Sequence, residues 1–284
     1  MIFLLAIAFV LIGYLNPFLA IVYGVGMTGD RLLKSGKMHY FFLTALASVC
    51  LLRIVGYLNN VDFFELVLLV LMVFVYFYLL LGKGSYDIAL LGAGVACFVG
   101  EALIFAYFHP YYQAVIQRSF SLAGDWVVGA NQQEYLEVAQ SMYSRNYPSL
   151  YAVLGLCSFY LGSILLGRKA EIPEFEFRKM VLPYWVDICL LGGLVFFVFR
   201  NSLPWPLGSN LLIFFAVAYM LVGMGVVFTI WQKWFERSKI LYFLFIVLLV
   251  INKYLLFVLS FLGLLERWFD FRKLNRRKDE SDFN

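Results

Sequence analysis

The strongest constraint on this chain is a series of apolar runs, each long enough to cross a lipid bilayer. A membrane-spanning helix needs about 20 mostly apolar residues, and it satisfies its backbone hydrogen bonds within the segment. Such runs, bounded by charged residues, Gly or Pro, occur at 1–27, 40–58, 63–81, 88–108, 149–167, 180–199, 210–231 and 240–265. The sequence therefore predicts an all-α fold, a polytopic integral membrane helical bundle of about 8 transmembrane helices that forms a single transmembrane domain over residues 1–284.

Composition supports the membrane assignment and excludes other classes. Hydrophobic residues make up 63% of the chain, charged residues 14%, and the mean hydropathy is +0.84. An average soluble domain carries about 25% charged residues, so this chain has too little charge to cover a soluble fold of its size. The same apolar content excludes disordered and collagen-like chains.

The first run and the connections have recognisable features. Asn16-Pro17 interrupts the first run, and since proline removes a backbone donor, we expect a kinked or broken helix there that is retained rather than cleaved as a signal peptide. Residues 109–148 form a polar segment between two spans, and the spacing of apolar residues from Gln132 to Tyr143 predicts a short interfacial helix within it. A basic, mixed-charge C-terminal tail follows at 266–284.

The distribution of Lys and Arg does not fix the orientation. The odd-numbered connections are basic, for example at Arg168, Lys169, Arg178 and Lys179, and they should face the cytoplasm. The tail is also basic, however, and an even number of spans would place it on the opposite side from those connections. The orientation stays open between these alternatives.

Four ionisable residues fall within predicted spans, where a charge costs roughly 2.5–3.5 kcal/mol on insertion scales. They are Glu101, Lys253, Asp187 and Arg53, whereas Asp62 and Glu65 lie near a span end and can reach the headgroups. One hypothesis makes the four residues ligand contacts, with Lys253 binding an anionic group and Glu101 a cation or proton. The alternative is that Glu101 or Asp187 simply neutralises Lys253 between helices.

Several classes of site are absent from the sequence. There is no G-x-x-x-x-G-K-[ST] loop, G-x-S-x-G elbow or H-E-x-x-H motif, so we expect neither nucleotide-driven transport by this chain alone nor an enzyme of those types. The four Cys are scattered and there are two His, which argues against a metal or haem site, and no cofactor is expected. A net charge of +4 suits anionic lipid and gives no nucleic-acid footprint.

Small residues in the spans predict close helix packing. Gly92, Ala96 and Gly100 follow one another at four-residue spacing, and Gly223 and Gly225 lie in a later span. Small side chains let helix backbones approach each other within a membrane. We interpret these residues as packing contacts.

The C-terminal half resembles the YybS-like family of predicted bacterial membrane proteins, whose domain has no known function. The resemblance lies in Asn210-Leu211-Leu212, continuing through Tyr219 and Leu221 to Gly223, and in the ending GLLERWFDFRK at 263–273, where Glu266 replaces an expected Asp. It implies a multi-pass protein of the bacterial cytoplasmic (inner) membrane. With its broken first helix, the bundle is also similar, at the level of the fold alone, to the substrate-capture subunits of energy-coupling-factor transporters.

Together these features predict a non-enzymatic, transport-related membrane subunit that binds a small molecule or lipid. Its expected partners are membrane lipid and, for a transport system, another membrane protein or an ATPase. A scaffold or assembly protein of the cell envelope is the alternative. A lipid-modifying enzyme comes third, because the acidic residues near the span ends do not cluster in the sequence.

Overall fold

The structure, a computed structural model, describes residues 1–83, 85–124, 130–169, 180–199, 206–232, 234, 238, 240, 244–245, 247–248 and 252–272. Every regular element in this part of the chain is a helix, which confirms the predicted all-α class. The chain divides into two compact units, Met1–Phe175 with Leu203–Pro206, and Glu176–Ser202 with Leu207–Asn284. Each unit is described separately below.

The first apolar run is broken where the sequence predicted. Helix α1 (Ile2–Leu15) ends at Asn16, whose backbone is extended (φ −158°, ψ 107°), and α2 (Pro17–Val22) begins at once. The Asn16 side chain accepts hydrogen bonds from the backbone N–H groups of Phe18 and Leu19, each at 3.0 Å. Pro17 occupies the first helical position, where its missing donor costs nothing. A π-helical turn, η1 (Tyr23–Met27), then continues α2.

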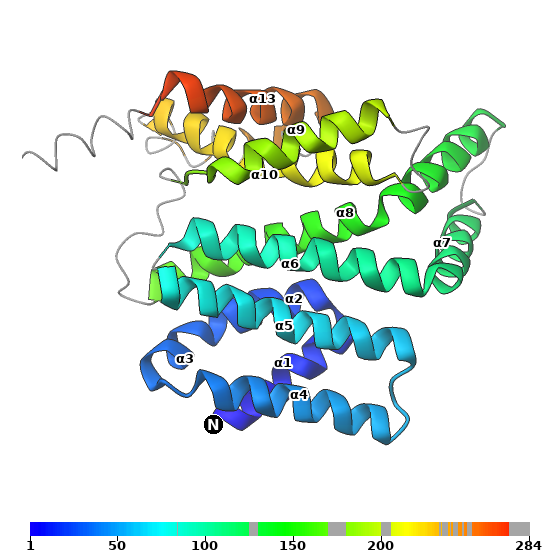
Figure 1. The fold of residues 1–284 in the computed structure, drawn as a ribbon, viewed down its shortest axis with the longest axis vertical. Coiled ribbons are helices and arrows are strands. Elements are labelled where there is room, and N and C mark those ends of the chain that lie inside the picture. Colours follow the sequence, from blue (N-terminus) through cyan, green and yellow to red (C-terminus); the bar gives the residue numbers. More distant parts are fainter. Residues whose placement is uncertain are drawn as a thin grey trace, which may run out of the picture. The chain divides into compact units, whose positions relative to one another are not determined.

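The other helices of the first unit are α3 (Gly29–Ser35), α4 (Met38–Ile54), α5 (Asn60–Lys83), α6 (Tyr86–Tyr107), α7 (His109–Gly124) and α8 (Ala130–Lys169). Helices α4, α5 and α6 and the C-terminal part of α8 coincide with predicted spans, whereas α3 and α7 do not. Figure 1 shows α5 and α6 running side by side as a hairpin, with α7 at the far end of α6. Helix α8 packs along α6, and Tyr76 of α5 is hydrogen-bonded to Ser163 of α8 at 2.6 Å in the interior.

The polar segment 109–148 differs from the prediction. Its first part forms α7, and residues 132–143 are not a separate short helix but the N-terminal portion of α8, which runs for 40 residues and continues through Pro148. At 1.5 Å per residue α8 is roughly 60 Å long, about twice the thickness of the hydrocarbon core. Its N-terminal part therefore extends beyond the span that the sequence placed at 149–167.

The second unit contains α9 (Tyr184–Val198), α10 (Leu207–Ile230) and α13 (Lys253–Phe269), with α10 packed against both of the others (Figure 1). The predicted run 240–265 is not one continuous helix. Asn252 has extended backbone (φ −108°, ψ 95°), and its side chain accepts a hydrogen bond from the Tyr254 backbone N–H at 3.0 Å. Lys253 is consequently the first residue of α13 rather than the midpoint of a span.

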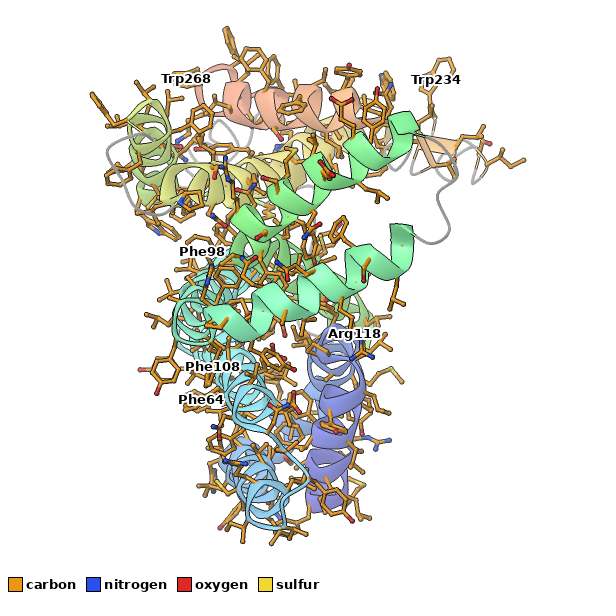
Figure 2. All side chains as sticks on the ribbon, turned by 90° about the vertical axis from the view of Figure 1, so that its right-hand side faces the viewer. Phe64, Phe98, Phe108, Arg118, Trp234 and Trp268 are labelled. Carbon is orange, nitrogen blue, oxygen red and sulfur yellow. The ribbon has the colours of Figure 1, made fainter. Side chains whose placement is uncertain are left out.

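Four of the described helices are long and apolar enough to cross a membrane, which supports a membrane protein. They are Asn60–Gly82, Tyr86–Tyr107, Glu134–Gly167 and Leu207–Ile230. Shorter apolar helices lie at Ile2–Leu15, Pro17–Met27, Met38–Ile54 and Tyr184–Val198. Trp234 and Trp268 of the second unit are exposed (Figure 2), as is typical of side chains at a membrane interface.

Candidate functional site

The α5–α6 hairpin places two carboxyl groups near the same end of the bundle. Glu65 lies about a turn and a half after the start of α5, and Glu101 about a turn and a half before the end of α6. Because the two helices are antiparallel and joined by a short connection, these positions come together. Glu101 is 0% exposed, whereas Glu65 is half-buried.

A single phenol joins the two carboxyl groups. The hydroxyl of Tyr112, on α7, donates to Oε1 of Glu65 at 2.6 Å and lies 3.3 Å from Oε1 of Glu101. A phenol has one proton, so it cannot satisfy both acceptors fully. The other oxygen of Glu101, Oε2, is buried and has no hydrogen-bond partner in the described part of the chain.

Aromatic rings surround the acidic groups. The ring centroids of Phe105, Tyr112 and Tyr147 lie 4.9 to 5.4 Å apart, and Val61 and Ile116 are buried in the same cluster. Toward the outside of the hairpin, Phe64 and Phe108 lie next to each other with centroids 5.7 Å apart (Figure 2). These rings keep water away from Glu101, and the low polarity strengthens every electrostatic interaction at the site.

Contacts between α7 and α8 hold Tyr112 in place. Gln113, the next residue, donates to the Ser144 hydroxyl at 2.7 Å and accepts from it at 3.1 Å. Burial raises the pKa of the Tyr112 phenol above its ordinary value of 10.0, and the neighbouring carboxyl groups of Glu101 and Glu65 raise it further. Tyr112 is therefore protonated at neutral pH and serves as a donor.

A second polar cluster lies in the other unit and contains Asp187. Nη2 of Arg267 is 2.9 Å from a carboxylate oxygen of Asp187, and the hydroxyl of Tyr219 donates to the other oxygen. Arg267 also donates to the Leu182 carbonyl at 2.6 Å, and its guanidinium lies 3.9 Å from the centre of the Tyr184 ring. The carboxylate of Asp187 is thus neutralised by an arginine on a neighbouring helix.

The C-terminal string that carries the family resemblance forms a second ion pair. Nε of Arg272 donates to Oε1 of Glu266 at 2.7 Å, and Arg272 also donates to the Met180 carbonyl at 3.0 Å. The backbone N–H of Phe271 donates to the other carboxylate oxygen of Glu266 at 3.0 Å. Both members of the pair are buried, at 8% and 4% exposure. The interactions close the end of α13, where Asp270 adopts a left-handed conformation (φ 42°).

The other two predicted ligand contacts are Arg53 and Lys253. The Arg53 guanidinium donates to the Leu58 carbonyl at 2.7 Å and to the Asn60 side chain, so it stabilises the turn between α4 and α5. Lys253 begins α13, and its side chain lies outside the described part of the chain. A pairing of Lys253 with Glu101 or Asp187 stays a prediction.

The structure brings Glu101 together with two residues that the sequence analysis did not select. Glu65 was interpreted as a headgroup contact and Tyr112 was not considered. The short connection between the third and fourth predicted spans was a usable signal for Glu65, because it requires an antiparallel hairpin. Comparison with known proteins finds no matching family model, no matching curated protein and no matching solved structure.

Proposed function

We propose that this chain is a non-enzymatic, transport-related subunit that binds a small molecule or lipid within a bundle of about eight spans. The four long apolar helices, the two shorter helices Met38–Ile54 and Tyr184–Val198, the broken run 1–27 counted as one span and the apolar run ending in α13 support this number. The resemblance to the YybS-like family supports placing the protein in the bacterial cytoplasmic membrane as a multi-pass protein.

The observation that carries the proposal is the buried Oε2 of Glu101, close to Glu65, for which the described residues supply no hydrogen-bond partner. An unsatisfied polar group in the interior costs about 1–3 kcal/mol, and more if it is charged. Acidic residues within membrane spans commonly mark the path of a substrate, ion or proton. Glu101 and Glu65 are therefore the proposed contacts for a cationic group or a proton.

The broken first helix supports a binding role for this part of the bundle. Phe18, just after the break at Asn16, packs against Tyr151 of α8 with ring centroids 5.0 Å apart. Tyr151 in turn neighbours Tyr147, which belongs to the aromatic cluster around Glu101. Interrupted helices line the binding sites of many transporters.

Native mass spectrometry of the protein extracted in its own lipid tests this function. We expect a bound small molecule or specific lipid in the wild type that is lost from Glu101→Gln and Glu65→Gln. Glu134→Gln is the matched control, because Glu134 is an exposed carboxylate on α8. Lys253→Met examines the second proposed contact. Identical bound molecules in the wild type and both site variants would refute a ligand site at these carboxyl groups.

The envelope-scaffold alternative is supported by the second unit, where Asp187 pairs with Arg267 and Glu266 with Arg272. In both pairs the carboxylate faces an arginine, and the arginine also donates to a backbone carbonyl of another segment. The exchange Asp187→Arg with Arg267→Asp tests this role. For a purely structural pair, each single change should lower the unfolding temperature, and the double change should recover part of the loss. No recovery would count against the scaffold role.

A further inference from the structure

The carboxyl pair has too few donors for two ionised groups. An ionised carboxylate accepts up to about four hydrogen bonds, so Glu65 and Glu101 together require several donors. The described interactions supply the Tyr112 hydroxyl alone, and neither carboxyl group forms an ion pair within the described residues. If both groups were ionised, two negative charges would share one donor. One of these charges, on Glu101, would be fully buried.

Among the described residues, the groups that interact with the pair carry no positive charge. The titratable side chains that interact with Glu101 or Glu65 all ionise to anions, and they are Asp62 on α5, Cys97 on α6, Tyr112 on α7, and Tyr147 and Tyr151 on α8. His109 of α7 is exposed and contacts Phe105 and Gln113. Arg118 and Arg145 are exposed as well. Within the described part of the chain no side chain compensates this pair, so a bound cation would.

A proton fits the site better than a metal ion. Ca²⁺ and Mg²⁺ take six or more oxygen ligands, including water, and the described residues contain no group of three or more His, Cys, Asp or Glu side chains able to hold a metal. The rings of Phe105, Tyr112 and Tyr147 pack directly against one another beside the carboxyl groups. A proton needs no coordination shell, and it turns one acceptor into a donor.

The two distances from Tyr112 indicate which carboxyl group carries the proton. An O–H donor bound to an ionised carboxylate lies about 2.5–2.7 Å from it, which matches the 2.6 Å distance to Glu65. The 3.3 Å distance to Glu101 is longer than an ordinary O–H···O hydrogen bond, so the phenol proton goes to Glu65 and Glu101 lacks the short contact that an ionised carboxylate forms. We infer that the cation bound at this site is a proton, held on Glu101 beside an ionised Glu65, an inference that rests on the proposed function for the role of the site.

Infrared spectroscopy of the full chain in lipid nanodiscs tests the bound proton directly. At neutral pH we expect the wild type to show the carbonyl band of one buried carboxylic acid, shifted in heavy water and absent from the spectrum of Glu101→Gln. Glu134→Gln should retain this band. A wild-type spectrum in which Glu101→Gln removes only ionised carboxylate absorption would overturn the inference.

A second variant keeps the test decisive if Glu101→Gln does not fold. Tyr112→Phe removes the hydroxyl that lies between the two carboxyl groups, so we expect the acid band to shift in frequency. A band that does not shift would come from a carboxyl group elsewhere and would contradict the assignment.

The outcomes also separate the proton site from the proposed function. The acid band together with bound molecules unaffected by Glu101→Gln would support the proton site and refute ligand binding there. Loss of a bound molecule without an acid band would support the ligand site and refute the proton.

Discussion

The buried and half-buried acidic groups of the two units have different partners. In the first unit, Glu65 and Glu101 face one phenol donor and no cation within the described residues. In the second, Asp187 and Glu266 each face an arginine and additional backbone or hydroxyl donors. A compensated pair stabilises the arrangement of its helices, whereas an uncompensated one has a remaining capacity to bind. The contrast locates candidate function in the first unit and structural roles in the second.

The largest effect should come from breaking the buried Glu266–Arg272 pair. Arg272→Met leaves the Glu266 carboxylate without its cation and the Met180 carbonyl without its donor, so we expect a loss of roughly 3–5 kcal/mol of unfolding free energy. Denaturant unfolding of the full chain in micelles measures this loss.

Two comparisons accompany that variant. The double variant Glu266→Met with Arg272→Met should recover much of the stability, because no buried charge is then left alone. Lys34→Met, which breaks the exposed Lys34–Asp30 pair at 3.0 Å, should cost no more than about 1 kcal/mol. An Arg272→Met protein as stable as Lys34→Met would show that the Glu266–Arg272 pair does not hold the second unit together.

A smaller loss of stability is expected when a methyl group is added where two helices pack closely, and the loss should differ between the two units. A Cβ atom at Gly223 of α10 would clash with the carbonyl oxygen of Leu259 on α13, which is backbone and cannot turn away. At Gly100 of α6 it would meet the end of the Leu68 side chain, which can change rotamer. We expect Gly223→Ala to cost about 1–3 kcal/mol and Gly100→Ala less, as measured by the same unfolding experiment. Equal losses would contradict this distinction.

The amino-acid sequence carried enough information for the class of fold and for part of the site. Apolar runs of membrane-spanning length predict the helices, and Asn16-Pro17 predicts the break, because both depend on local chemistry. Glu101 could be selected from its position within a run. Glu65 could have been added from the short α5–α6 connection, which brings both carboxyl groups to one end of a hairpin.

Features that depend on tertiary packing could not be predicted. Tyr112 reaches the carboxyl groups because α7 folds back against α6 and α8, and no pattern in residues 109–124 shows that return. Arg267 meets Asp187 across a long separation in the sequence. The extended backbone at Asn252 lies within an apolar run that looks continuous, so the position of Lys253 was misjudged. For Tyr112 and Arg267, contacts distant in sequence decided the outcome, whereas at Asn252 a local cap by its own side chain begins the new helix.

The smallest predicted effect is on how stability depends on pH in the alkaline range, and it arises in the first unit alone. The pKa of the Tyr112 phenol is raised by burial in the folded protein, so above pH 10.0 the unfolded chain loses this proton while the folded chain retains it. The folded state then binds more protons than the unfolded state, and its stability falls as the pH rises. Tyr112→Phe removes this contribution. Its unfolding temperature should therefore fall less steeply than that of the wild type between about pH 9 and about pH 11, a range that spans the ordinary tyrosine pKa. Parallel profiles for the two proteins would mean that water reaches Tyr112 and the carboxyl groups beside it, and the contrast between the units would lose its basis.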